Sequence, residues 1–184
     1  VEDARIIADV LITSDLWGVR SHGVAHLKMY RERMKAGLQL PVTRMTVVKD
    51  TPTTAVMDGG NGMGMVVGHH AMVLAIQKAR QYGLGAVAVR NSSHYGVAGY
   101  YPMMAVREGL VGVSFTNGHP SQAPTFGVRP MLGTNPIAVA APTDEAQLVQ
   151  QNVRNIANRT FYQREGRWID SQVSKEQEAK ATRI

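Results

Sequence analysis

The 184-residue chain contains no cysteine. Disulfide bonds, thiolate metal sites and cysteine nucleophiles are therefore excluded, and we expect a cytoplasmic protein. Long apolar runs are also lacking, since nothing approaches the roughly 20 consecutive apolar residues of a membrane-spanning helix. Charged residues make up only 18% of the chain and aromatic residues 6%, against 44% hydrophobic residues. This composition is typical of a globular protein with one core of good size.

The charge balance is basic, with 20 Lys and Arg against 14 Asp and Glu and a formal net charge of +6. Such a balance suits anionic partners, either nucleic acid or a small molecule that carries phosphate or carboxylate. The basic residues form no dense cluster, and no aromatic-rich RNA-binding motif accompanies them. We therefore expect no nucleic-acid partner and no membrane partner, and the basic surface leaves room for a small acidic ligand.

Hydrophobic periodicity predicts an α/β fold, with an N-terminal helical unit followed by a mixed sheet with crossover helices. Helices are expected over 2–16, from Ser21 to about Ala36, over 66–82 and over 98–108. Strands are expected over 45–49, 53–58, 85–90, 110–116 and 137–141. The order strand, helix, strand between residues 85 and 116 predicts a crossover unit.

Three regions follow from this pattern: a helical unit over 1–40, an α/β core over 41–142 and a divergent tail over 143–184. The tail has two short strand-like stretches, 160–163 and 167–170, around a turn at 164–166, which together predict a hairpin. Residues 171–184 are charged, and we expect a frayed end there.

His94 stands in a loop of small residues, Asn91-Ser92-Ser93-His94-Tyr95-Gly96, between a predicted strand and a predicted helix. In α/β sheets ligands bind where strands end and such loops begin. Histidine is also the side chain whose ordinary pKa suits proton transfer near neutral pH. A solvated surface histidine is the competing interpretation. The neighbouring motifs must therefore decide between a catalytic and a surface role for His94.

His22, His26 and Tyr30 recur every four residues, which places them on one face of the predicted second helix. Imidazole and phenol groups can anchor a carboxylate or hydroxyl of a substrate, whereas a solvated polar face fits the spacing equally well. Two histidines four residues apart can also share a metal ion, but the HExxH signature is absent. We predict substrate binding and no metal site.

Gly60, Gly62, Gly64 and Gly68 follow a predicted strand and open a helix, as in dinucleotide-binding proteins. The spacing departs from GxGxxG, and Arg90-Asn91 stand where a ribose-binding acid would end the next strand. A flexible loop with tight helix packing explains these glycines as well as a Rossmann motif does. Asn117-Gly118 and Gly133-Thr134-Asn135-Pro136 lie at strand boundaries, where they can form turns or offer polar groups to a nicotinamide or ribose.

Four ordered motifs carry a resemblance over residues 1 to about 142. They are Asp15-Leu16-Trp17-Gly18-Val19-Arg20-Ser21-His22-Gly23-Val24, Asn91-Ser92-Ser93-His94-Tyr95-Gly96, Thr116-Asn117 and Leu132-Gly133-Thr134-Asn135-Pro136. Together they resemble the malate/L-lactate dehydrogenase family of NAD(P)-dependent 2-hydroxyacid oxidoreductases, which includes ureidoglycolate and sulfolactate dehydrogenases. The resemblance implies a non-Rossmann dehydrogenase fold, a homodimer and NAD or NADP as cofactor.

The resemblance also implies roles for particular residues. His94 would be the catalytic acid/base, and His22, His26 and Tyr30 would contact a small 2-hydroxy or 2-oxo acid. Asn117, Gly118, Thr134 and Asn135 would lie on the cofactor side of the cleft. His26 stands where the family commonly has arginine, and histidine is a pH-dependent partner without the bidentate fork of arginine.

The family pattern continues well past Pro142, whereas this chain diverges there. We therefore expect an incomplete fold. Two interpretations stay open: an active dehydrogenase of small 2-hydroxy acids, or a truncated, inactive family fragment that acts at most as a binding or dimerising module.

Overall fold

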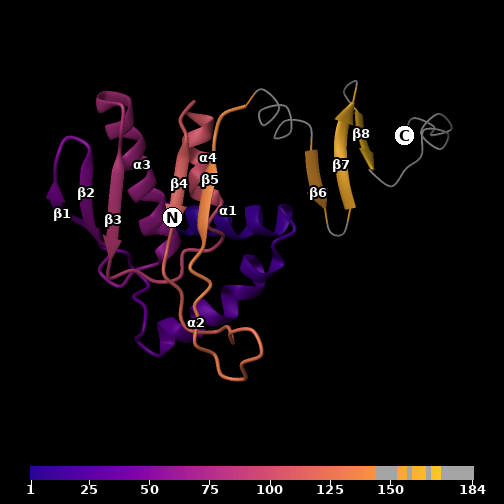
Figure 1. The fold of residues 1–184 in the computed structure, drawn as a ribbon, viewed down its shortest axis with the longest axis horizontal. Helices are drawn as coiled ribbons and strands as arrows, with labels where there is room; N and C mark the ends of the chain where they lie inside the picture. The colour runs from indigo at the N-terminus through magenta and orange to yellow at the C-terminus, as the bar shows by residue number, and fades with distance from the viewer. Residues whose placement is uncertain (144–152, 157–158, 165–166, 171–184) are drawn as a thin grey trace.

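A computed structural model describes residues 1–143, 153–156, 159–164 and 167–170 (Figure 1). Its helices are α1 (Glu2–Leu16), α2 (Leu27–Lys35), α3 (Gly64–Tyr82) and α4 (Tyr100–Arg107), with short 3₁₀ turns η1 (Arg20–His22) and η2 (Val24–His26) between α1 and α2. Its strands are β1 (Thr46–Asp50), β2 (Thr54–Asp58), β3 (Ala86–Arg90), β4 (Gly112–Phe115), β5 (Ile137–Ala140), β6 (Val153–Ile156), β7 (Arg159–Arg164) and β8 (Arg167–Asp170). Within this part of the chain, no helix combines the length and the apolar character that a membrane span requires.

The predicted α/β class is confirmed, and a three-stranded mixed sheet in the order β1-β2-β3 forms one half of it. Strand β1 pairs with β2 antiparallel, and β2 pairs with β3 in parallel. The parallel pair needs a crossover, and α3 provides it, packing along β3 (Figure 1). Helix α3 ends where predicted, at Gly83, whose φ of 81° is easily adopted only by glycine.

The second sheet corrects one prediction. Strand β4 pairs antiparallel with β5 in a separate two-stranded ladder, so the strand–helix–strand unit between residues 85 and 116 joins two different sheets. The true crossover lies one unit earlier, at β2–α3–β3. The sequence pattern predicted the helices and strands but not which strands pair, because strand pairing depends on contacts between distant segments.

One face of the β4–β5 ladder is open to solvent. Val113 lies opposite Val139 and Phe115 lies opposite Ile137 in the register. All four are exposed, with Phe115 and Ile137 each retaining 74% of their accessible surface. We call these four residues the open apolar stripe. The other face of the ladder contacts α4, and the Ser114 hydroxyl donates a hydrogen bond to the carbonyl of Ala98, two residues before that helix (2.7 Å).

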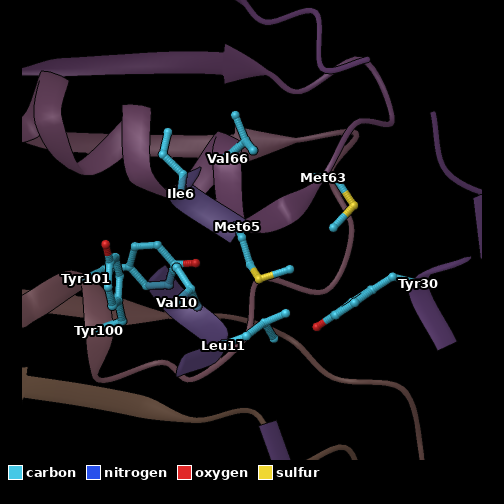
Figure 2. Close-up of a cluster of buried hydrophobic side chains, with 9 residues drawn as sticks. All are labelled: Ile6, Val10, Leu11, Tyr30, Met63, Met65, Val66, Tyr100 and Tyr101. Carbon is cyan, nitrogen blue, oxygen red and sulfur yellow. The ribbon is translucent and has the colours of Figure 1, made fainter. Parts of the chain in front are cut away.

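The main core lies where α1, α3 and α4 meet (Figure 2). Its buried members are Ile6, Val10, Leu11, Tyr30, Met63, Met65, Val66, Tyr100 and Tyr101. The α1 residues recur at helical spacing, which is why their burial agrees with the predicted amphipathic helix. Tyr30 reaches the cluster from α2, with its ring extended toward Met65 and Leu11 (Figure 2). Helix α2 is thereby fixed to the same core that supports α1 and α3.

Strand β7 pairs antiparallel with β8 over the two stretches for which a hairpin is predicted, and β6 adds a third strand to β7. The turn residues 165–166 and the predicted frayed end at 171–184 lie outside the described residues.

Candidate active site

The predicted second helix does not form at two of the candidate site residues, His22 and His26, which lie in the 3₁₀ turns η1 and η2. The prediction of one helix from Ser21 to Ala36 is wrong over residues 21–26, because η1 and η2 precede α2 and Gly23 between them is extended (φ −90°, ψ −155°). Ser21 does not cap the helix, and its hydroxyl lies 3.0 Å from Nδ1 of His22. His22 and His26 therefore do not share a face of one α-helix.

The side chains nevertheless converge. The ring centroids of His22 and His26 lie 5.9 Å apart, and that of His94 lies 5.4 Å from His22 and 5.5 Å from His26. Tyr30 completes the group, with its hydroxyl 2.7 Å from Nδ1 of His94. We call these four residues the histidine cluster. The structure thus brings together every residue predicted to be catalytic or to bind substrate.

The loop that carries His94 packs against the glycine-rich segment at the start of α3. The Ser93 hydroxyl accepts a hydrogen bond from the Gly64 amide and donates one to the Gly62 carbonyl, each at 3.0 Å. A Cβ atom at Gly64 would overlap the carbonyl groups of Ser93 and His94. These glycines therefore allow close approach of two backbones, and the segment is anchored rather than free. This packing explains why the glycine spacing differs from a dinucleotide-binding motif.

Burial and neighbouring positive groups set the protonation of the cluster. Burial, followed by the charges of His22, His26 and Arg33, lowers the pKa of His94 to about 4. Burial, followed by His26, lowers the pKa of His22 as well. Burial raises the pKa of Tyr30 to about 12, although Arg33 opposes the shift. At neutral pH His94 is therefore an uncharged imidazole and Tyr30 a neutral phenol.

Two protein groups lie within hydrogen-bond distance of Nδ1 of His94. Besides Tyr30, the Gly96 backbone amide lies 3.3 Å from this nitrogen and can only donate. The contact favours the neutral tautomer that carries its hydrogen on Nε2. Nε2 is thus the nitrogen left for a substrate.

Arg33 is a charged neighbour of the histidine cluster that the sequence reasoning missed. It lies three positions after Tyr30 and seven after His26, so it falls on the same side of α2. Its positive charge acts on both His94 and Tyr30. The i, i+4, i+7 spacing from His26 was the signal that could have revealed it.

The four residues predicted to contact the cofactor form a second group, after β4 and before β5. Oδ1 of Asn135 accepts a hydrogen bond from the Gly118 amide at 2.7 Å. Thr134 lies against Gly118, and a Cβ atom at Gly118 would stand 3.1 Å from the Thr134 hydroxyl. Asn117, Thr134 and Asn135 are exposed, so their polar groups are accessible to a ligand.

A hollow of about 410 Å³ lies elsewhere, against the C-terminal half of α3 and the β1–β2 turn. Lys78 on its wall is buried, and its ammonium group lies 2.5 Å from Asp50 and 2.6 Å from the carbonyl of Thr51. Because its charge is already paired, this lysine is not an anion site. Among the described residues no group of three or more His, Cys, Asp or Glu side chains is arranged to hold a metal ion.

Comparison with known proteins agrees with this geometry. The family model described as malate/L-lactate dehydrogenase matches residues 1–150. The chain belongs to the malate/L-lactate dehydrogenase family. The histidine cluster and both loops of the second group lie within the matched residues.

Individual members of the malate/L-lactate dehydrogenase family show how much is shared. The chain is 54% identical over 142 residues to malate dehydrogenase of Pyrococcus abyssi, covering 77% of this chain and 39% of that protein. It is 47% identical over 139 residues to L-sulfolactate dehydrogenase of Methanocaldococcus jannaschii, covering 76% and 40% respectively. The solved structure of malate dehydrogenase from Pyrococcus horikoshii superposes with a TM-score of 0.74 at 50% identity, covering 78% of this chain and 41% of that one. The chain thus spans about two-fifths of the length of these relatives.

Proposed function

We propose that the chain transfers a hydride between a nicotinamide cofactor and a small 2-hydroxy acid of the malate or lactate type, with His94 as the acid/base. The observation that carries this proposal is the 2.7 Å contact between the Tyr30 hydroxyl and Nδ1 of His94, inside a cluster with two further imidazoles. Relatives named malate dehydrogenase and L-sulfolactate dehydrogenase support the reaction class.

In the oxidation direction Nε2 of His94 takes the proton of the substrate hydroxyl. The hydrogen on the carbon that bears this hydroxyl leaves as hydride at the same time. The C–O bond becomes a carbonyl, and one proton remains on the imidazole. Nε2 must hold a lone pair to do this, so the reacting form is the Nδ1–H tautomer, in which Nδ1 donates to the Tyr30 oxygen and the 3.3 Å contact with the Gly96 amide is given up. In reduction the imidazolium returns its proton to the carbonyl oxygen.

The carboxylate of the substrate would be met by His22, His26 and Arg33. Burial is the main cause of the lowered pKa of His94, and the positive charge of Arg33 contributes in the same direction. His26 supplies a single hydrogen-bond donor at a time to this carboxylate, whereas the arginine common in the family presents a planar fork. Recognition of the carboxylate would therefore rely less on a bidentate pair.

The second group fits the neutral part of a nicotinamide cofactor, because Asn117, Thr134 and Asn135 offer exposed amide and hydroxyl groups beside the close Gly118 contact. These residues would hold the carboxamide or ribose, and the bound nicotinamide would supply the hydride acceptor or donor. We propose NAD or NADP in this role. By the same family resemblance we propose a cytoplasmic homodimer.

A second candidate function is a binding or dimerising module without turnover. It is favoured by the open apolar stripe on β4 and β5, an exposed apolar surface that a second protein surface could cover.

Titration of the purified chain with NADH and with NADPH, followed by nicotinamide fluorescence, tests the proposal. Saturable binding together with oxidation of malate, lactate, sulfolactate or ureidoglycolate supports the dehydrogenase. Saturable binding without turnover of any of the four supports the module. A folded chain, verified by circular dichroism, that binds neither cofactor overturns the dehydrogenase proposal.

A further inference from the structure

The segment that carries His22 and His26 has little stability of its own. It consists of two three-residue 3₁₀ turns separated by the extended Gly23. Turns of this length have poor hydrogen-bond geometry, and only η2 is continued by a helix, α2, whereas the extended Gly23 separates η1 from it. The 5.9 Å separation of the two imidazoles must therefore be imposed from outside the segment.

The C-terminal end of α1 supplies that constraint. The Ser14 hydroxyl, completely buried, donates to the carbonyl of Val19 at 2.7 Å, and the Val19 amide donates to the carbonyl of Ser14 at 2.9 Å. The next residue, Asp15, accepts a hydrogen bond from the Val24 amide at 3.0 Å through Oδ2. The two bonded backbone sites, Val19 and Val24, bracket η1 and the start of η2.

Gly23 fits against the same carboxylate. A Cβ atom at Gly23 would overlap the Asp15 carboxyl group, although the backbone angles of Gly23 suit any residue. Glycine is thus required here for space and not for conformation. The Gly23 carbonyl also accepts the hydrogen bond from the His26 amide, at 3.0 Å. A displacement of the Gly23 backbone would therefore also displace His26, a member of the histidine cluster.

We propose that Asp15 is a positioning residue that sets the placement of His22 and His26 through the Val24 amide and through the space left at Gly23. The assignment rests on the proposed function, because the histidines matter as contacts for a carboxylate substrate. It adds to the site a residue that touches neither substrate nor cofactor. Its effect belongs to substrate binding, since His94 is held by Tyr30 and by its own loop, which Ser93 anchors to Gly62 and Gly64.

Four variants test the assignment: Asp15→Ala, Asp15→Asn, Gly23→Ala and the double variant Asp15→Ala/Gly23→Ala. Asp15→Ala should raise KM for the 2-oxo acid about ten- to a hundredfold while kcat and the acid limb of its pH profile stay near parental values. Asp15→Asn should restore most of the loss, because the amide oxygen still accepts from Val24. Asp3→Asn, on the first turn of the same helix, is the matched control.

Gly23→Ala should lower the melting temperature in the parent and add nothing in the Asp15→Ala background, because the overlapping carboxylate is then gone. Additive losses would overturn the proposed contact. Equal loss in Asp15→Ala and Asp15→Asn, with kcat and KM changing together, would overturn positioning in favour of a general structural role.

A readout independent of turnover separates failure of this assignment from failure of the proposed function. The ¹⁵N resonances of the His22 and His26 imidazoles should shift in Asp15→Ala and return in Asp15→Asn, with or without dehydrogenase activity. If the parent has no activity but the resonances respond in this way, the function fails and the positioning role holds. Unchanged resonances in Asp15→Ala would overturn the positioning role.

Discussion

The Tyr30 hydroxyl and Nδ1 of His94 lie 2.7 Å apart although 64 residues separate them in the chain. Tyr30 is 2% exposed and belongs to the main core, whereas His94 lies on a loop. The contact therefore couples a buried phenol to the proposed acid/base. It also fixes which imidazole nitrogen can face a substrate.

Removing the Tyr30 oxygen tests this coupling. We expect Tyr30→Phe to fold, with a loss of unfolding free energy of about 1 kcal/mol for the hydrogen bond. Turnover should fall about tenfold or more, because the Nδ1–H tautomer, which leaves Nε2 free to take a proton, then loses its hydrogen-bond acceptor. Steady-state kinetics at fixed cofactor measure the effect, with Tyr82→Phe on the exposed end of α3 as the control. Parental kcat in Tyr30→Phe would contradict the role given to the hydroxyl.

Replacement of His94 should abolish turnover and leave the fold intact. Glutamine keeps a polar side chain of similar length but cannot exchange a proton near neutral pH, so we expect His94→Gln to lose at least about a hundredfold in kcat. His70→Gln on α3, outside the histidine cluster, is the matched control. Undiminished activity in His94→Gln, measured by NADH oxidation with a 2-oxo acid, would refute the proton-transfer role.

Stability should depend on pH in a way that reports the buried imidazole. The pKa of His94 falls from its ordinary 6.5 to about 4 in the folded chain, so the unfolded state binds more protons between these values. The free energy of unfolding should therefore rise with pH through this window and fall as acid is added. His22, whose pKa is also lowered, adds a contribution of the same sign.

Thermal unfolding between pH 4 and 7 measures this dependence. The decline in melting temperature with acid should be shallower in His94→Gln than in the parent, and parental in a His119→Gln control on an exposed loop. Identical curves for the parent and His94→Gln would show that the imidazole is not held neutral in the fold.

Restoring the arginine common in the family should strengthen substrate binding. His26→Arg places a permanently charged fork beside His22 and His94, and we expect KM for a 2-hydroxy acid to fall about five- to tenfold with a smaller change in kcat. Lys28→Arg, exposed on the first turn of α2, is the control. A raised KM in His26→Arg would mean that this cleft is shaped around the smaller imidazole.

Much of the fold followed from local patterns. Helix α1 matches its predicted bounds, and α3 begins only two residues before its predicted start, because apolar spacing and Gly83 are local signals. The predicted strands over 53–58 and 85–90 also reappear as β2 and β3, each one residue shorter.

The site was predicted less completely. Periodicity extended α2 through Ser21 because it contains no information about the Asp15 carboxylate that binds Val24 from another element. Two further contacts also join distant segments of the chain. They are the hydrogen bond between Gly64 and Ser93 in the His94 loop, and the contact between Tyr30 and His94. The family motifs identified His94 itself, whereas Arg33 required the helix face to be considered as a whole.

The open apolar stripe has a consequence for handling the protein. Val113, Phe115, Ile137 and Val139 form two directly opposed cross-strand pairs whose side chains face water. Flat apolar strand surfaces of this kind promote association between molecules. We expect solubility to be limited by this surface, with turbidity appearing at lower protein concentration in ammonium sulfate, because such salts strengthen apolar association. Dilute solutions at moderate ionic strength are therefore the conditions under which the chemistry of the histidine cluster is best measured.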